Sequence, residues 1–419
     1  MTATRDGAPQ PAVVVTDPRL VVQQRGLSGY LSETWRRIRG GELGSIPVVI
    51  GLIIIWAIFQ TMNSGFLAPG YLSQISVDIV ATGMMATGIV FVLLLGEIDL
   101  SIGSVSGACA AILAVANQRW GFSEWESILM AVVVGLAMGL IHGFFFAKIG
   151  VPAFIVTLAG LLGWLGFMLW VLGSTGSYNL SNTDGLIDRL TGTYFAETFW
   201  AYGLAGVVTV GYLAVCLYGW RRRVKAGIPT RRPVEIIVRS VLLGVVLFGI
   251  AVVFNQARGL PLAPVIFLVF VVGLDFVLRH TSYGRKVFAV GGNVEAARRA
   301  GINVTAIRIS VFAISGTMAA IGGVFFASVN QNITKSGTGQ DILMDAIAAA
   351  VIGGTSLFGG RGSTYSALLG VLVIQSIAAG MNLVGITDYA QYMVTGVVLL
   401  AAVVIDSISR RSQRASGRA

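Results

Sequence analysis

Long apolar segments separated by short polar breaks follow one another from residue 46 to residue 408. A helix that crosses a bilayer needs about 20 mainly apolar residues. By this measure the pattern predicts twelve membrane-spanning helices, at 46–62, 72–95, 102–118, 126–147, 153–173, 198–219, 235–255, 262–279, 306–328, 343–357, 364–382 and 390–408. Glycines interrupt the tenth, so the expected number is ten to twelve. The chain is therefore predicted to be an all-α polytopic membrane protein.

Composition agrees with this interpretation. Of the 419 residues, 55% are hydrophobic and only 11% are charged, whereas globular domains carry roughly a quarter charged residues. The two cysteines, Cys109 and Cys216, both fall inside apolar segments. They indicate small buried side chains rather than a disulfide framework.

The formal net charge of +10 would suit a nucleic-acid partner, but the placement of the basic residues argues against one. In a twelve-helix arrangement, all 29 Lys and Arg residues fall on one side except Arg119, Arg189, Arg258 and Lys335. Positive charge gathers on the cytoplasmic side of membrane proteins. We therefore expect both termini in the cytoplasm. Residues 1–45 are then a cytoplasmic extension, since they lack the apolar core and cleavage site of a signal peptide, and 409–419 are a basic cytoplasmic tail.

The most basic loop reads W-R-R-R-V-K-A-G-I-P-T-R-R-P at 220–233. Such loops commonly anchor topology against anionic lipid, and this explanation is favoured over docking of a protein partner. The two predicted helices around the loop, within about 198–255, look like an insertion in a smaller core.

A polar and basic stretch at 282–304 separates the eighth and ninth predicted helices. Residues 293–301 within it are expected to form a short surface helix. Asn293 can cap the start of this helix through its side-chain oxygen, and Gly301 suits a left-handed stop just past its end.

Charge placement supports the same short helix. Glu295 lies in its first turn, and Arg298 and Arg299 lie in its last turn, where the helix dipole favours these signs. A helix about 12 Å long is too short to span a bilayer. It is long enough to dock in a groove of a soluble partner, and so to serve as a cytoplasmic coupling helix.

Acidic and hydroxyl side chains occupy the very short break between the second and third predicted helices. Ionisable groups at membrane depth are costly and tend to be functional. At the cytoplasmic end of two helices, where we place this break, they could equally be solvated or cap the next helix. If they function, they line the substrate pathway or its gate; the residues concerned are Glu97, Asp99, Ser101 and Ser104.

A second Gly/Ser-rich break resembles the first. Residues 96–112 read G-E-I-D-L-S-I-G-S-V-S-G-A-C-A-A-I, and 353–370 read G-G-T-S-L-F-G-G-R-G-S-T-Y-S-A-L-L-G. Paired interruptions in the two halves of a transporter often mark its pathway, which would include Gly353 and Gly354. The alternative is two ordinary turns followed by small-residue helix packing.

Polar residues also gather between the ninth and tenth predicted helices, on the side opposite the basic loops. This outer rim would receive a soluble binding protein or a polyol, or it is simply a hydrated loop. Its candidate contact residues are Asn330, Gln331, Lys335, Asp341 and Asp345.

Several chemistries are not supported by the sequence. None of the four lysines follows a G-x-x-x-x-G-K-[ST] loop, so no phosphate-binding loop for ATP is present. His142 and His280 are too isolated for a zinc or catalytic cluster. No nucleophile and base can be paired, so we expect a transport subunit rather than an enzyme.

Three motifs give the chain a family resemblance over about 46–408. They are G-E-I-D-L-S-I-G-S at 96–104, A-V-G-G-N-V-E-A-A-R-R-A-G-I-N-V at 289–304, and V-I-G-G-T-S-L-F-G-G-R-G-S at 351–363. In these the chain resembles permease subunits of bacterial ABC sugar importers of the ribose, xylose and galactose group. Glu97 stands where that family more often has glycine. The added helices near 198–255 are more similar to xylose-type permeases.

The resemblance implies an inner-membrane complex. A second permease chain, expected to be an identical copy, would complete the pathway, and an extracytoplasmic sugar-binding protein would deliver a pentose such as xylose. ATP and magnesium would bind a separate ATP-binding subunit, with no cofactor in this chain. That subunit would contact the coupling helix, at Asn293, Glu295, Ala296, Ala297, Arg298, Arg299 and Gly301.

Two other functions stay open on the sequence. An ion-driven secondary sugar transporter shares the helix number and the sidedness, but needs a coupling acid buried at mid-membrane. Glu97 and Asp99 are its best candidates, and the predicted topology puts both near an edge. An intramembrane enzyme is disfavoured because no catalytic set of residues can be assembled.

Overall fold

The computed structural model describes residues 46–180, 185–227, 233–335 and 340–415. The predicted extension at 1–45 and the last residues of the basic tail, 416–419, lie outside the described residues. The longer helices are α2 (Ile46–Met62), α3 (Pro69–Leu94), α4 (Ile102–Gln118), α5 (Glu124–Phe144), α6 (Ala153–Leu172), α8 (Thr198–Lys225), α9 (Pro233–Gln256), α10 (Leu262–His280), α13 (Val304–Asn330), α14 (Gln340–Ile352), α15 (Thr364–Val384) and α16 (Asp388–Ala415).

Each predicted span coincides with one of these helices, which makes the chain an all-α polytopic membrane protein. Among the described residues, eight helices are long and apolar enough to cross a bilayer, while α2, α4, α14 and α16 contain shorter apolar stretches. The tenth predicted span, 343–357, extends beyond the end of the helix that the structure shows. That helix, α14, ends at Ile352, because Gly353 begins a turn that Gly354 continues with a φ of +104°.

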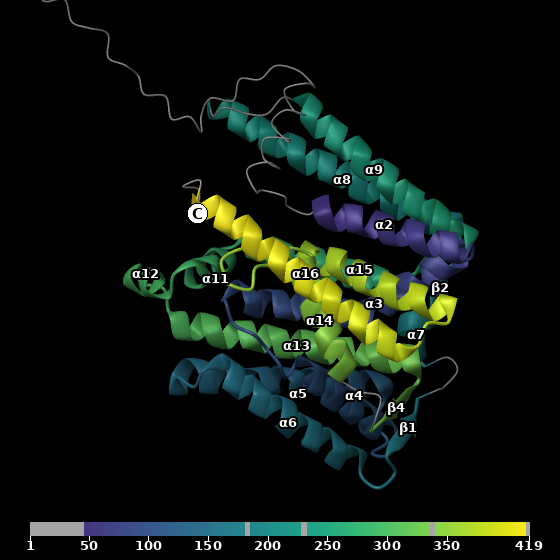
Figure 1. Cartoon of the computed structure of the whole chain (residues 1–419), viewed down its shortest axis with the longest axis vertical. Coiled ribbons are helices and arrows are strands. Elements are labelled where there is room, and N and C mark those ends of the chain that lie inside the picture. The colour runs from purple at the N-terminus through teal and green to yellow at the C-terminus, as the bar shows by residue number, and fades with distance from the viewer. Residues whose placement is uncertain (1–45, 181–184, 228–232, 336–339, 416–419) are drawn as a thin grey trace, which may run out of the picture.

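The centre of the bundle is α3, which packs against α13, α15, α14, α4 and α10. In turn α13 packs against α5 and α4, so most of the buried surface lies on these central helices. Figure 1 shows α8 and α9 along one edge and α5 and α6 along the opposite edge. Helices α8 and α9 pack mainly on each other and turn large apolar side chains such as Val207 and Val245 outward.

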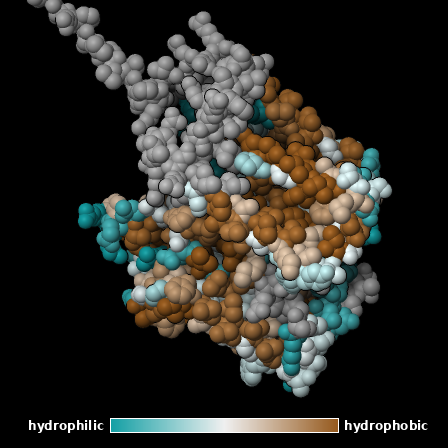
Figure 2. All heavy atoms as spheres, in the orientation of Figure 1, coloured by the Kyte–Doolittle hydropathy of each residue, from teal (hydrophilic) through white to brown (hydrophobic). Residues whose placement is uncertain are grey.

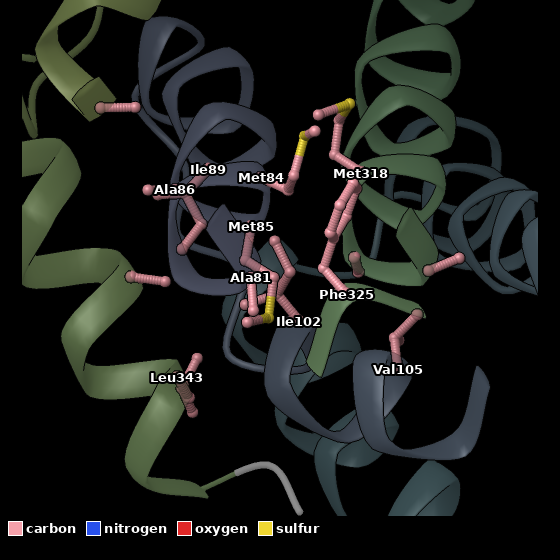
Figure 3. Close-up of a cluster of buried hydrophobic side chains, with 14 of the residues drawn as sticks. Ala81, Met84, Met85, Ala86, Ile89, Ile102, Val105, Met318, Phe325 and Leu343 are labelled. Atoms are coloured by element: carbon pink, nitrogen blue, oxygen red, sulfur yellow. The ribbon is translucent and has the colours of Figure 1, made fainter. Parts of the chain in front are cut away.

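Side chains from four helices meet in the core (Figure 3). Met84 and Met85 of α3 face Met318 and Phe325 of α13, while α4 and α14 contribute Ile102, Val105 and Leu343. All of these side chains are buried. Methionine fills irregular gaps between helices because its unbranched chain adapts easily.

Short antiparallel sheets tie together the loops at one end of the bundle. Strand β1 (Ser177–Asn179) pairs with β4 (Asn332–Thr334), and β2 (Tyr194–Phe195) pairs with β3 (Leu260–Pro261). The seven-residue helix α7 (Leu186–Gly192) lies beside them and packs on α13. None of these elements was predicted from the apolar pattern.

The opposite end carries two small helices, α11 (Ser282–Gly292) and α12 (Val294–Arg299), together with the last turns of α16 (Figure 1). Apolar residues cover the middle of the face seen in Figure 2, with hydrophilic residues at its two ends. This is the distribution expected of a protein that sits across a bilayer.

Candidate functional site

The short surface helix expected at 293–301 is present as α12, and its role in coupling stays a prediction. Asn293 caps it, since the Ala296 N–H donates to the Asn293 side-chain oxygen at 2.9 Å. Gly301 adopts a φ of +79° and ends it, with its N–H donating to the Arg298 carbonyl and the Ile302 N–H donating to the Ala297 carbonyl. Local hydrogen bonds therefore cap both ends of this six-residue helix.

The side chains of α12 divide into a buried contact and an exposed charged face. Ala297 is buried against the bundle. Glu295 and Arg298 form an ion pair of 2.9 Å, with side chains 66% and 61% exposed, and Arg299 is also exposed. An exposed pair of this kind contributes little stability, about 0–1 kcal/mol. The charged face of α12 is thus free for another molecule without loss to the fold.

Helix α11 leads directly into α12 and was not predicted. Thr281 begins it, accepting a hydrogen bond from the Gly284 N–H at 3.3 Å. Its buried residues, Gly284, Val287 and Val290, recur every third position. That spacing after a threonine cap was a local signal for a short helix.

The three motifs that carry the family resemblance meet at the end of α11. The Gly360 N–H donates to the Leu94 carbonyl at 2.9 Å. A Cβ added to Gly291 would overlap that same carbonyl oxygen, and one added to Gly359 would lie 2.7 Å from the Gly291 oxygen and 3.0 Å from the Gly96 nitrogen. We call this backbone contact of Leu94, Gly96, Gly291, Gly359 and Gly360 the glycine joint.

The glycine joint connects two interruptions of the bundle to α11. The first break, residues 95–101, lies between α3 and α4, and the second break, residues 353–363, lies between α14 and α15. The helices that follow or precede them, α4 and α14, are both short and pack on each other and on α3. The two segments that resembled each other in sequence are therefore neighbours in space.

A buried carboxylate organises the far end of the first break. Asp99 is 3% exposed. Its Oδ1 accepts from the Ser101 N–H at 2.9 Å and the Ser101 hydroxyl at 2.6 Å, and its Oδ2 accepts from the Ser315 hydroxyl at 2.8 Å. The Ser101 oxygen lies 3.3 Å from Nδ1 of His142, whose Nε2 accepts from the Trp164 indole at 2.8 Å. We call these five residues the Asp99 relay.

The donors of the Asp99 relay can be assigned in order. An indole nitrogen only donates, so Nε2 of His142 carries no proton and Nδ1 must carry it. Nδ1–H then donates to the Ser101 oxygen, whose own hydrogen points to Asp99. All the bonds that reach Asp99 end on its oxygens. This arrangement requires a neutral imidazole at His142, and it joins the first break to α5, α6 and α13.

Asp99 lies deeper than the sequence suggested. Its partner Ser315 is eleven residues beyond Val304, the first residue of α13. At about 1.5 Å per residue, this places the carboxylate about 16 Å along that helix. Asp99 is therefore buried rather than solvated, although it lies only three residues before Ile102, the first residue of α4.

Glu97 behaves differently from Asp99. It is half-buried, and burial raises the pKa of its carboxyl above the ordinary value, while the nearby Arg308 guanidinium opposes the rise. The other predicted pathway residues are placed as follows. Ser104 is buried in α4. Gly353 is buried against the backbone of Ser366 of α15, where an added Cβ would overlap the Ser366 carbonyl, and Gly354 is exposed.

His142, Trp164 and Ser315 were missed in the sequence. His142 seemed isolated because its partner Ser101 lies 41 positions away. One signal was available, since a histidine inside an apolar span must find a hydrogen-bonding partner to offset the cost of its burial.

The outer rim is partly described. Gln331 holds a left-handed turn with a φ of +53°, and its amide donates to Asp188 at 3.0 Å, which ties α13 to α7. Asn330 and Lys335 are exposed beside strand β4. Asp345 is half-buried in α14, and the side chain of Asp341 lies outside the described residues. The contacts of these residues with a partner stay a prediction.

Comparison with known proteins agrees with this architecture. Residues 71–403 match the family described as the branched-chain amino acid transport system permease component. The chain is 34% identical over 370 residues to the xylose transport system permease protein XylH of Escherichia coli, covering 87% of this chain and 92% of the relative. It is 33% identical to the XylH of Haemophilus influenzae over 90% of this chain and 99% of that one. The ribose import permease RbsC of Escherichia coli is 30% identical over 86% and 92%.

The chain therefore belongs to this family of transporter permeases. Within the family it is the permease of an ABC sugar importer, a multi-pass protein of the inner membrane. No solved structure matches the chain.

Proposed function

We propose that this chain is the translocation subunit of an ATP-driven importer of a pentose such as xylose. Two xylose permeases are 34% and 33% identical to it, against 30% for a ribose permease, and each match covers most of both chains. The helices near 198–255, whose added length suggested the xylose type, are the α8–α9 pair at the edge of the bundle.

The exposed face of α12 is the observation that carries the ATP-driven mechanism. A separate ATP-binding subunit, holding ATP and magnesium, docks on α12 and contacts Glu295, Arg298 and Arg299, while Ala297 fixes the helix to the bundle. Asn293 and Gly301 set the length of the docking element, because they cap its two ends. Ala296 completes the contact.

The remaining partners follow from the two ends and the flanks of the bundle. A second copy of this chain lies alongside and completes the pathway. An extracytoplasmic sugar-binding protein docks at the opposite end, on the rim that includes Asn330 and Lys335. Lipid covers the outward apolar faces, such as those of α8 and α9. With ATP bound, the ATP-binding subunits draw the α12 helices of the two copies together, and the bundles rock between outward-facing and inward-facing states.

A charge-swap experiment tests this docking site. Glu295→Arg alone and Arg298→Glu alone break the exposed ion pair, and the double variant restores it with the charges exchanged. If the pair only supports α12, the double variant transports normally. We expect all three to lose sugar uptake coupled to ATP hydrolysis, because the partner meets the wrong charges in each. Thermal midpoints should stay close to wild type, given the small stability of an exposed pair. Normal coupled uptake in the double variant would remove α12 from the interface.

One observation favours a second candidate, the ion-driven secondary transporter. That mechanism needs an acid buried at mid-membrane, and Asp99 is buried inside the bundle beside Ser315 of α13. Reconstitution separates the two. Uptake into vesicles that needs the ATP-binding subunit and internal ATP supports the importer, whereas uptake by this chain alone under a proton or sodium gradient supports the alternative. Competition of labelled xylose by unlabelled ribose or glucose then identifies the sugar.

A further inference from the structure

We propose that the glycine joint is a rigid connection through which α11 and α12 move both interior breaks as one body, with Gly291 as its positioning residue. This inference rests on the proposed function, since it concerns how motion imposed on α12 reaches the interior of the bundle. It assigns a role to contacts that lie outside the docking surface itself.

The first step is the directness of the contact. At Gly291 the main chain of α11 lies against the carbonyl of Leu94, with no room for even a methyl group between them. Gly359 meets the Gly291 oxygen and the Gly96 nitrogen in the same way. The hydrogen bond of 2.9 Å from the Gly360 N–H to the Leu94 carbonyl joins the second break to the last residue of α3.

The second step is mechanical. Side chains between two elements can change rotamer and absorb a displacement, whereas main chains in direct contact cannot. Close-packed regions are stiff and transmit strain. A shift of α11 must therefore displace the C-terminal end of α3 together with the second break. Rearrangement of side chains cannot absorb this shift.

The third step is where the displacement goes. The first break is held at two points: Gly96 belongs to the glycine joint, and Asp99, three positions later, belongs to the Asp99 relay. The relay bonds the break to α5, α6 and α13. Motion that enters at Gly291 thus reaches helices on both sides of the buried centre. The second break passes it to α14 and α15, which adjoin it in the chain.

The first experiment inserts a single methyl group into the joint. Gly291→Ala places a Cβ onto the Leu94 carbonyl, whereas Gly292→Ala, the adjacent residue of α11, has no atom within 4 Å of the added Cβ and serves as the matched control. In the full complex we expect Gly291→Ala to assemble and hydrolyse ATP but to lose most of the sugar transported per ATP. Gly292→Ala should keep the wild-type ratio. A wild-type ratio in Gly291→Ala would overturn the proposal.

The second experiment leaves the joint intact and decides the matter if Gly291→Ala does not assemble. Spin labels are placed at Lys286→Cys on α11 and Phe358→Cys in the second break, both exposed positions, in a chain whose Cys109 and Cys216 are alanine. The distance between them within one chain should be the same without nucleotide and with trapped ATP. A distance that changes between these states would overturn the rigid connection.

A singly labelled complex separates this outcome from failure of the proposed function. With Lys286→Cys alone, the label-to-label distance between the two permease copies should shorten when ATP is trapped, because the docking helices are drawn together. No change there would count against the proposed function. A change there, combined with a changed Lys286-to-Phe358 distance, would refute the glycine joint alone.

Discussion

Removing the Ser315 hydroxyl tests whether Asp99 is an ionised acceptor at membrane depth. Ser315 of α13 donates to Oδ2 of Asp99 at 2.8 Å, and both side chains are buried. Among the described residues, the other hydrogen bonds to Asp99 come from Ser101 and reach Oδ1. Ser315→Ala therefore leaves Oδ2 without its donor while changing little volume.

The expected cost follows from the charge. A hydrogen bond to a charged group contributes about 1.5–3 kcal/mol, against about 0.5–1.5 kcal/mol for a neutral one. Ser315→Ala should thus lower the free energy of unfolding by about 2 kcal/mol. In an Asp99→Asn background the same change should cost only about 1 kcal/mol. The difference, a coupling of about 1 kcal/mol, measures the charge-assisted part of the bond.

The assay is unfolding by sodium dodecyl sulfate in mixed micelles, followed by far-ultraviolet circular dichroism. Thr317→Ala is the matched control, because within the described ranges its hydroxyl donates to the Ala313 carbonyl of the same helix and to no other helix. That change should stay within about 0.5 kcal/mol. If Ser315→Ala and Thr317→Ala destabilise equally, Asp99 is not an ionised acceptor of the Ser315 hydroxyl.

Two further predictions concern helix packing and pH. A Cβ on Gly370 of α15 would overlap the Ala349 carbonyl of α14, so Gly370→Ala should destabilise the protein by about 1–3 kcal/mol, while Gly396→Ala, with no atom within 4 Å, should be neutral in the same unfolding assay. The raised pKa of Glu97 means that its protonated form is favoured in the folded state. Its contribution to stability is then fully present below the ordinary glutamate pKa and lost as pH rises through the raised one. Glu97→Gln should flatten the dependence of the thermal midpoint on pH across that window; an unchanged dependence would contradict the burial of this carboxyl.

Local signals accounted for what was correctly predicted. The apolar segments located the long helices because each must present an apolar surface over its whole length. The start and stop of α12 were legible because Asn293 and Gly301 act on the main chain beside them. The end of α14 was misplaced because the apolar stretch runs through Val351 and Ile352 up to the turn. Only the glycines at 353 and 354 indicate that the helix ends there.

Long-range contacts could not be predicted in this way. Nothing near Gly291 in the chain indicates that its partner is the carbonyl of Leu94. Asp99 was a candidate because a charged group inside a membrane protein is costly to bury. Whether it is solvated or buried, however, depends on contacts such as that with Ser315, 216 positions away. Side-chain pairing across such separations is decided by the packing of α3 on α13, and hydropathy records only that both helices are apolar.

The backbone contact at Gly291 and Gly359 also explains why three short sequence motifs are enough to identify the family of the chain. A lipid-facing valine can be exchanged for leucine or isoleucine at little cost, so we expect the residue type at such positions to vary among relatives. Where any side chain would overlap a neighbouring main chain, no residue other than glycine fits. We therefore expect descendants of a common permease to diverge over most of their length and still share the few glycines at which three distant stretches of chain touch.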